Sequence, residues 1–321
     1  MIEVTDLKKH YWLSGMPWLG GRPGTLKAVD GVSFQIAAGE TLGLVGESGS
    51  GKSTVGQMLL MQTPPTEGSI RFDGTEIQDL GKGAADVLKG KVQVVFQDPY
   101  DSLNPRMRVR DIIAEPLRNL KQFSAQEIRS KVDAVIQRVG LRVDDLAKFP
   151  HQFSGGQRQR IGIARAISVN PKFVVLDEPV SALDVSVQAQ VINLLLEIQQ
   201  QHQIAYLFIS HNLAIVEHVC DRVVILYLGK VAEILATDDL HQQKLHPYTR
   251  ALIDSIPVPD PARVKATVPL QGEIPDPMNL PTGCRFSPRC AMAQGVCRER
   301  EPALTDLGGG HWMACHRSAE L

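Results

Sequence analysis

Short runs of alternating apolar and polar residues fill roughly the first 95 positions of the chain. Residues 33–36, 41–45 and 69–72 follow this pattern, and Gly and Asp residues separate the runs. Alternation with a period of two is typical of half-buried strands. We therefore expect this part to be rich in β-structure, with one helix beginning near Lys52.

The pattern changes to a helical period between residues 98 and 170. Ser124 and Glu127 have the spacing of a capping box, in which the serine accepts the Glu127 amide proton and the glutamate reaches back. Apolar positions then recur at helical spacing up to Gly140, which we expect to end the helix. These positions are Ile128, Val132, Val135, Ile136 and Val139.

Strand-sized apolar runs alternate with helical segments between residues 172 and 235. The predicted strands are 172–176, 205–209 and 223–228, and a helix is predicted over 187–200. Apolar strands separated by helices imply a parallel sheet that is covered on both faces.

Beyond residue 240 the chain becomes rich in proline. Such a segment is expected to form a looped extension that cannot extend the sheet, because proline lacks a backbone donor. We therefore predict a first domain over residues 1–240, with a helical region at about 98–165, and an extension over 241–321. The prolines of this segment include Pro247, Pro257, Pro259, Pro261, Pro269, Pro275, Pro277 and Pro281.

The composition does not favour nucleic acid or direct membrane insertion. The chain has 34 Lys and Arg residues against 35 Asp and Glu residues, so no bulk positive charge favours nucleic acid. No stretch approaches the ~18 apolar residues that span a bilayer. The N-terminus lacks the layout of a signal peptide, so a cytosolic protein is expected, with any membrane role acting through partners.

Residues 46–53 match the phosphate-binding loop Gly-x4-Gly-Lys-Ser/Thr, between an apolar strand and a helix. The glycines let backbone N–H groups converge on phosphate, Lys52 would neutralise the β- and γ-phosphates, and the Ser53 hydroxyl would bind Mg2+. A Gly-rich turn formed by chance is the competing interpretation. The expected nucleotide contacts are Gly46, Glu47, Ser48, Gly49, Ser50, Gly51, Lys52, Ser53 and Thr54.

Two adjacent acidic residues directly follow the predicted strand 172–176. Asp177 has the position of an acid that holds Mg2+, and Glu178 could serve as the general base for the attacking water. A pair of solvated acids is the competing interpretation. Gln97 is predicted to bind Mg2+ and sense the γ-phosphate, and His211 to contact the γ-phosphate, although either residue alone could be an ordinary turn residue.

A second anion site is predicted at residues 154–157, because Ser154 would cap a helix whose first amides are exposed by Gly155 and Gly156. Gln157 completes this motif. One catalytic unit has no second nucleotide for it, so we expect a head-to-tail pair in which each such helix closes over the ATP of the other subunit. Asp184 would lie on the same seam.

In this order the motifs resemble those of the ATP-binding cassette (ABC) ATPases, over residues 1 to about 235. The resemblance implies an α/β P-loop NTPase fold of RecA-like type, with an antiparallel β subdomain and a helical subdomain. Family members stack adenine on an aromatic residue near the N-terminus. Tyr11 holds that place, with Trp12 as a second candidate and strand packing as the alternative role of Tyr11.

The tail resembles the C-terminal extension of ATPases that drive oligopeptide, dipeptide and nickel importers, at residues 245–249, 270–275 and 283–290. The insert between Tyr11 and Ala28 is similar to that of the second ATPase subunit in such importers.

Four cysteines crowd into the last 38 residues, separated by 5, 6 and 17 residues: Cys284, Cys290, Cys297 and Cys315. They lack the Cys-x2–4-Cys pairs that zinc prefers. Four thiolates on a looped scaffold suit a [4Fe–4S] cluster, which occurs at this tail in the family resembled. Zinc or free thiols remain alternatives, His311 and His316 could act as substitute ligands, and Cys220 is expected to be a buried small residue.

The resemblance implies an ATPase that energises import of di- and oligopeptides, as a peripheral subunit at the cytoplasmic face of the bacterial inner membrane. The implied partners are a second ABC ATPase subunit, a paralogue ahead of a second copy, two membrane permease subunits and, indirectly, an extracytoplasmic solute-binding protein. Residues 98–120 would dock on the permease. Related ATPases serve nickel, glutathione or opine importers.

Two hypotheses from other classes compete with transport. A soluble ABC ATPase of ribosomes or DNA repair would typically carry two cassettes or a coiled-coil insert, and neither is found in this sequence. A non-hydrolysing, ATP-gated interaction module would not need the intact Glu178.

Overall fold

The computed structural model describes residues 1–13, 24–78, 88–98, 100, 102–241, 244–256 and 272–321. The chain divides into two compact units, each built from distant segments. The first unit comprises Met1, Ile36–Thr41 and Ile77–Ile209, and the second comprises Ile2–Gln35, Leu42–Glu76 and Ser210–Leu321. The predicted boundary at residue 240 divides the chain into consecutive domains, which differs from this division into units, and it stays a prediction.

The first unit contains three parallel strands with the predicted apolar character. β7 (Phe173–Asp177) lies between β6 (Val92–Val95) and β8 (Ala205–Ser210). The first four residues of β7 and all of β8 are buried. Strands with buried side chains on both faces are typical of covered parallel sheets. The apolar character of these runs therefore predicted their environment correctly.

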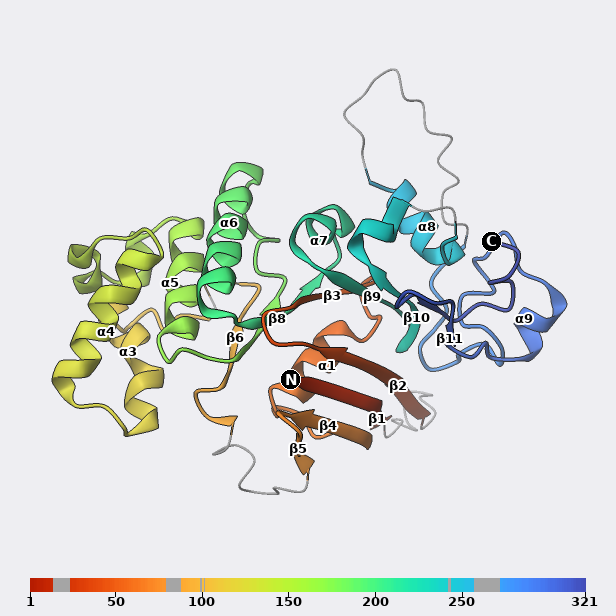
Figure 1. Ribbon diagram of the computed structural model, residues 1–321, viewed down its shortest axis with the longest axis horizontal. Helices are drawn as coiled ribbons and strands as arrows, with labels where there is room; N and C mark the ends of the chain where they lie inside the picture. The colour runs from red at the N-terminus through yellow and green to blue at the C-terminus, as the bar shows by residue number, and fades with distance from the viewer. Residues whose placement is uncertain (14–23, 79–87, 99, 101, 242–243, 257–271) are drawn as a thin grey trace, which may run out of the picture. The chain divides into compact units, whose positions relative to one another are not determined.

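Helices make up the rest of the first unit, and Figure 1 shows α3, α4 and α5 grouped together. No helix begins before Val109 among the described residues of the predicted 98–170 region, because residues 102–108 form turns. The helices are α3 (Val109–Leu120), α4 (Ala125–Arg138), α5 (Gly155–Ile167) and α6 (Val185–His202), with short 3-10 turns η3 (Val143–Ala147) and η4 (Pro150–Gln152).

The predicted capping box at the start of α4 is confirmed. The Ser124 hydroxyl accepts the Glu127 amide at 3.3 Å, and the Glu127 carboxylate accepts the Ser124 amide at 2.7 Å. Both bonds satisfy amides that have no partner inside the helix. Gly140 follows the helix with a φ of 75°, a conformation that favours glycine.

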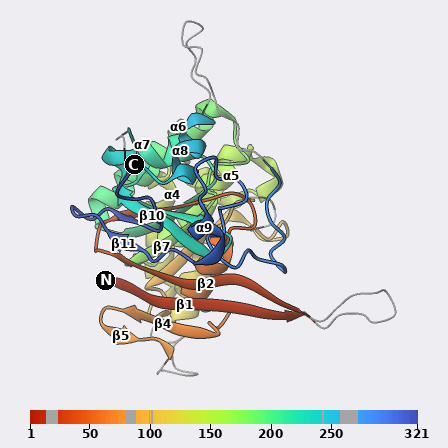
Figure 2. The same cartoon turned by 90° about the vertical axis from the view of Figure 1, so that its right-hand side faces the viewer.

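The second unit contains an antiparallel sheet from the N-terminal part of the chain. Its order is β2 (Gly24–Ile36), β1 (Ile2–Leu13), β4 (Glu67–Phe72) and β5 (Thr75–Glu76). Figure 2 shows β1 and β2 as long neighbouring strands. This sheet confirms the predicted antiparallel β region.

The second unit also carries the strands that support the phosphate loop. β3 (Thr41–Val45) pairs in parallel with β9 (Arg222–Tyr227), and β10 (Lys230–Ala236) pairs antiparallel with β9. The helices of this unit are α1 (Lys52–Leu59), α7 (Leu213–Val219), η5 (Thr237–His241), α8 (Pro247–Asp254) and α9 (Gly295–Glu299).

The prediction that the proline-rich tail cannot extend a sheet is wrong. β12 (Trp312–Met313) pairs with β10, and β11 (Thr305–Asp306) pairs with β12. The pairing segments lie beyond the last tail proline, Pro302, so their backbone donors are intact. Pro247 begins α8 because the first helical position needs no amide donor. Residues 257–271, with four of the predicted loop prolines, lie outside the described residues.

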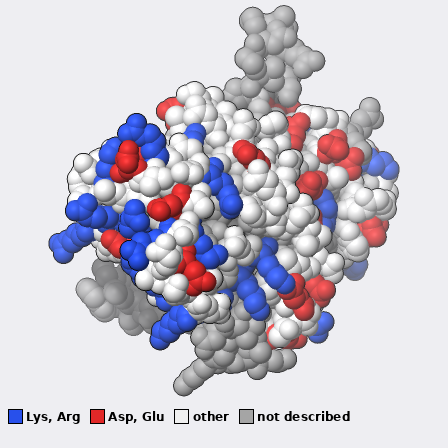
Figure 3. Space-filling view, turned by 60° about the vertical axis from the view of Figure 1, so that its left-hand side comes forward, with Lys and Arg blue, Asp and Glu red and all other residues white. Residues whose placement is uncertain are grey.

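Charges of both signs share the surface of the molecule. Figure 3 shows one face on which Lys and Arg side chains are interspersed with Asp and Glu. Ion pairs link neighbouring elements, for example Arg110 with Asp133 at 3.6 Å between α3 and α4. Within the part of the chain that the structure describes, no helix has the length and apolar character needed to cross a membrane.

Replacing Ser124 with Ala should loosen the start of α4. Loss of a cap of this kind lowers helix stability by about 1 kcal/mol, which corresponds to roughly fivefold faster amide exchange in the first turn. Hydrogen–deuterium exchange of the full chain measures this effect. Ser130→Ala, at an exposed position inside the same helix, is the matched control and should leave exchange unchanged or slower. Equal exchange in Ser124→Ala and the unmodified chain would contradict the capping role.

Candidate functional site: a phosphate loop and its surroundings

The predicted phosphate loop connects β3 to α1 and is closely enclosed by backbone. Gly51 precedes α1 with a φ of 104°. A Cβ at this position would collide with the carbonyl oxygen of Ala28, and a Cβ at Gly46 would collide with that of Leu226. Both positions therefore require glycine, as the motif predicts.

Lys52 is buried at the start of α1, and its ammonium group holds the loop together. Nζ donates to the carbonyl oxygens of Gly46 at 2.7 Å and Glu47 at 2.9 Å. Beside them the Ser50 hydroxyl oxygen is buried and has no hydrogen-bond partner among the described residues. A buried cation and an unsatisfied hydroxyl in a Gly-rich loop before a helix fit the phosphates of a nucleotide.

The other predicted loop contacts differ in exposure. Ser48 and Gly49 are exposed at the tip of the loop, Ser53 is exposed in the first turn of α1, and Thr54 is half-buried behind it. An exposed hydroxyl next to the phosphate loop is suited to a Mg2+ ion, which prefers oxygen ligands.

Glu178 directly follows β7 and has an unusual backbone conformation. Its φ is 46°, in the left-handed region that few residues other than glycine adopt. Its amide donates to the Ile209 carbonyl oxygen at 3.0 Å, and the Ser181 hydroxyl donates to its carbonyl oxygen at 3.1 Å. Strain of this kind is often found at functional sites, because the surroundings must impose it.

Gln97 and Glu178 are brought together, 81 positions apart in the sequence. The Gln97 Nε2 group donates to Glu178 Oε2 at 3.1 Å. This bond turns the nitrogen of the amide toward Glu178, so the oxygen is the end available to a cation. Asp177 is half-buried at the end of β7, beside Glu178. Amide and carboxylate oxygens fit the donor set of Mg2+.

The Ser154 motif forms the predicted helix start. Ser154 caps α5 by accepting the Gln157 amide at 3.4 Å, and Gln157 Oε1 accepts the Ser154 amide at 3.0 Å. Gly155 and Gly156 occupy the first turn, and a Cβ at Gly156 would collide with the side chain of Val187 in α6. The glycine is thus also needed for the close packing of α5 and α6.

α5 also contacts the segment that carries Gln97. Gln159 Nε2 donates to the Phe96 carbonyl oxygen at 3.3 Å, and the Arg158 guanidinium lies over the Tyr100 ring at 3.5 Å. Asp184 caps α6 by accepting the Val187 amide at 3.0 Å. This bond is the main reason that the pKa of Asp184 is lowered.

Tyr11, His211 and the phosphate loop belong to the second unit, whereas Gln97, Asp177, Glu178 and residues 154–157 belong to the first. Tyr11 is half-buried in β1, and the Lys9 ammonium lies 5.1 Å from its ring centroid. Trp12 is 83% exposed. His211 is exposed immediately after β8. The predicted roles of these residues toward a nucleotide stay predictions.

Two tail residues also contact the loop, and the sequence did not predict these contacts. The Glu47 amide donates to the Tyr248 hydroxyl at 2.9 Å, and Arg289 donates to both oxygens of the Glu47 carboxylate, at 2.6 and 3.0 Å. The partners are 201 and 242 positions apart. The position of Arg289 directly before Cys290 was the only indication in the sequence, and it does not predict which residue Arg289 contacts.

The four tail cysteines line one pocket together with His316 and Phe286. All four are free thiols. Burial raises the pKa of Cys284 to about 11, so this group is a neutral thiol unless a cation binds it. The His311 ring lies 2.8 Å from Glu233 Oε1, and His316 Nε2 lies 2.9 Å from the Arg300 carbonyl oxygen, so both rings have protein partners.

The described residues give no direct support for a metal ion or a cluster in this pocket. No three Cys, His, Asp or Glu side chains converge closely enough to hold one metal ion, in so far as the chain is described. Each thiolate of a four-iron cluster binds a separate iron, so the thiols need to face one cavity but need not meet at one point. Cys220 is buried, as predicted, and burial raises its pKa.

Comparison with known families agrees with these motifs. Residues 29–181 match the ABC transporter family, and residues 232–297 match the family "Oligopeptide/dipeptide transporter, C-terminal region". The oligopeptide transport ATP-binding protein AppF of Bacillus subtilis is 46% identical over 323 residues, which cover 98% of this chain and 97% of AppF.

Solved structures share the fold. The ATP-binding cassette MJ0796, in a dimeric post-hydrolysis state bound to ADP and Pi, has a TM-score of 0.65 and 26% identity, and the match covers 74% of this chain and 99% of that one. The Clostridium perfringens protein cbiO1, part of the ABC transporter complex cbiONQ, has a TM-score of 0.65 and 28% identity, with 76% and 91% covered. The chain is therefore an ABC ATPase with the P-loop NTPase cassette fold, and it belongs to the family of oligopeptide transport ATP-binding proteins.

Proposed function

We propose that this chain hydrolyses ATP to energise peptide import by an ABC transporter. The observation that carries the peptide class is the tail, because residues 232–297 match the C-terminal region of oligopeptide and dipeptide transporters and the similarity to AppF extends over almost the whole chain. No observation favours nickel, glutathione or opine-like solutes over peptides.

The chemistry of this proposal is that of a nucleotide shared by two cassettes. The phosphate loop binds ATP, with Lys52 as the cation for its phosphates and Tyr11 against the adenine. Ser53, Gln97 and Asp177 would hold Mg2+, which would supply charge neutralisation at the phosphates. Glu178 orients and deprotonates the attacking water, and His211 contacts the γ-phosphate.

A second cassette completes the site. Residues 154–157 and Asp184 of one subunit close over the ATP bound to the other. We expect the second cassette to be a paralogue ahead of a second copy of this chain. The Ser154 cap and the two glycines at the start of α5 support an anion-binding role, since a helix N-terminus favours negative charge.

Closure of the two cassettes is coupled to a pair of membrane permease subunits. Residues 98–120, which include α3, contact the permease and transmit the movement. The chain works at the cytoplasmic face of the membrane without entering it, and the peptide meets an extracytoplasmic binding protein and the permease. Nucleic acid is no partner.

Glu178→Gln should abolish ATP hydrolysis while leaving ATP binding intact. Removal of the general base costs about 100-fold or more in rate. Phosphate release at saturating MgATP measures hydrolysis, and size-exclusion chromatography with MgATP, of this chain alone and mixed with its paralogue, measures pairing. Glu197→Gln, at an exposed position of α6, is the control and should hydrolyse ATP normally. Unchanged hydrolysis in Glu178→Gln, or the absence of any ATP-dependent pairing, would overturn the proposed mechanism.

The transport role predicts a membrane partner. Isolation of the tagged chain in mild detergent should recover two permease subunits and a second ABC ATPase, identified by mass spectrometry. Peptide-loaded binding protein should then stimulate ATP hydrolysis by the reconstituted complex. Recovery of ribosomal proteins without a permease would contradict the transport role, and stimulation by nickel complexes but not by peptides would contradict the peptide class.

We propose also that Cys284, Cys290, Cys297 and Cys315 hold a [4Fe–4S] cluster that ties down the tail. The support is that four free thiols line one pocket without zinc-type spacing. Anaerobically purified protein should contain about four irons and four sulfides per chain. Cys290→Ser should lose most of this iron, whereas Cys220→Ala should retain it. Stoichiometric zinc, or neither metal, would rule the cluster out.

A further inference from the structure

The tail grips one residue of the phosphate loop by two of its groups. The Glu47 amide is occupied by the Tyr248 hydroxyl, and its carboxylate is held at both oxygens by Arg289. A guanidinium that donates two parallel bonds to a carboxylate fixes direction as well as distance. The Arg289 side chain is only 5% exposed, so water screens this pair weakly.

Aromatic packing holds these two tail residues in place. The rings of Tyr227, Tyr248 and Phe286 meet with centroids 4.7 to 5.3 Å apart, and all three are buried. Arg289 also donates to the Tyr227 hydroxyl at 3.4 Å. Buried rings in mutual contact have few alternative rotamers, so the groups that hold Glu47 are themselves fixed.

A second tail arginine supports the loop from behind. Arg285 donates to the Leu228 carbonyl oxygen and to the Asp30 carboxylate. Leu228 is in the turn between β9 and β10, and the next residue, Gly229, donates its amide to the Ser50 carbonyl oxygen at 2.9 Å. The Asp30 amide in turn donates to the Gly229 carbonyl oxygen at 2.9 Å. Arg285 therefore fixes a turn that is bonded directly to the phosphate loop.

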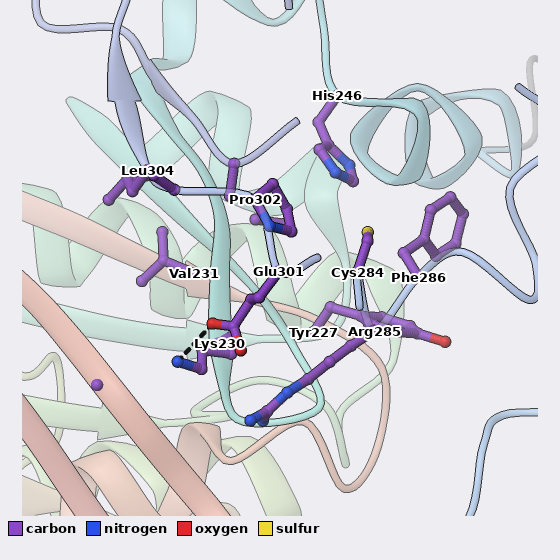
Figure 4. Close-up of a pocket in the computed structure, with 14 residues that line it drawn as sticks. Tyr227, Lys230, Val231, His246, Cys284, Arg285, Phe286, Glu301, Pro302 and Leu304 are labelled. Carbon is purple, nitrogen blue, oxygen red and sulfur yellow. Dashed lines mark ion pairs between the residues drawn. The ribbon is translucent and has the colours of Figure 1, made fainter. Parts of the chain in front are cut away.

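Both arginines are next to cysteines of the tail. Arg285 follows Cys284, and Arg289 precedes Cys290. Figure 4 shows the Cys284 sulfur and the Arg285 guanidinium pointing in opposite directions, at a pocket of about 180 Å3 between the tail and β9–β10. The Cys284 thiol and the Arg285 guanidinium thus face different ways, and Arg289 of the same short segment contacts the phosphate loop at Glu47.

We propose that Arg285, Arg289 and Tyr248 are positioning residues, through which the cysteine-bearing tail holds the phosphate loop in its nucleotide-binding conformation. The inference rests on the proposed ATP-binding role of residues 46–53. A loop that is fixed before binding loses less conformational freedom when it binds, so the tail contacts raise the affinity for nucleotide.

A purely stabilising role explains these contacts poorly. Buried ion pairs contribute little net stability because desolvation offsets their attraction, and Arg289 Nε is buried without a partner among the described residues. The two bonds fix the orientation of the Glu47 side chain, and an apolar pair of the same size could not do so.

The test is the affinity of the full chain for MgADP, which has the phosphates that the loop would cradle and is not hydrolysed. Arg289→Gln should raise the Kd about tenfold, which corresponds to the loss of one charge-assisted contact. The KM for ATP should rise by a similar factor, with a smaller change in kcat. Arg298→Gln is the matched control, because Arg298 also adjoins a cysteine but is exposed, and its Kd should be unchanged.

A double-mutant cycle separates positioning from loss of stability. If Arg289 acts through Glu47, Glu47→Gln and Arg289→Gln should each raise the Kd for MgADP. The Kd of the double variant should then be no higher than that of the single variant that binds MgADP more weakly. Additive losses, or a lower thermal unfolding temperature with an unchanged Kd, would overturn the proposal.

A milder variant covers the case in which Arg289→Gln does not fold. Tyr248→Phe keeps the ring and removes only the acceptor for the Glu47 amide, and should raise the Kd about threefold. An unchanged Kd in Tyr248→Phe would refute the positioning role by itself. Failure of the unmodified chain to bind MgADP at all would instead refute the proposed function of the loop.

Discussion

The close enclosure of the phosphate loop by backbone is the constraint on which the second unit depends. Carbonyl oxygens of Ala28 and Leu226 stand where side chains of Gly51 and Gly46 would be, so the loop can be built only from glycine at these positions. Ala28 lies in β2, and Leu226 in β9. A loop confined in this way cannot adjust independently of the strands around it, because packed backbone leaves no room for alternative conformations.

The tail becomes part of this arrangement through charge. Burial alone would raise the pKa of the Asp30 carboxyl, but its bonds to His10 and Arg285 lower it, so the acid remains ionised and holds both groups. The pKa of Arg289 is raised by its bond to Glu47. Removing one member of such a buried pair leaves the other charge uncompensated, at a cost of about 3–5 kcal/mol. Breaking either pair is therefore costly, although an intact pair adds little net stability, and its effect is to fix where the tail contacts the cassette strands.

Local features were predictable from the sequence, whereas distant pairings were not. The capping box of α4, the Ser154 cap of α5, the end of β7 at Asp177 and the glycine positions of the phosphate loop depend on neighbouring residues. Their spacing in the sequence was therefore enough to predict them. The bond between Gln97 and Glu178 was not predicted. The contact between Arg289 and Glu47, and the pairing of β12 with β10, depend on folding that brings remote segments together, and the proline content of the tail concealed the strand.

Two groups with proposed roles toward phosphate are already hydrogen-bonded within the chain. Lys52 holds the carbonyl oxygens of Gly46 and Glu47, and Gln97 holds Glu178. A phosphate that binds to Lys52 must compete with these carbonyl oxygens, so the gain is a difference between two sets of bonds and not a full new set. An anionic phosphate wins because it adds attraction between opposite charges, which a neutral carbonyl oxygen cannot offer to the ammonium. A neutral ligand of the same shape would gain nothing by the exchange, so the internal bonds make the loop selective for charge.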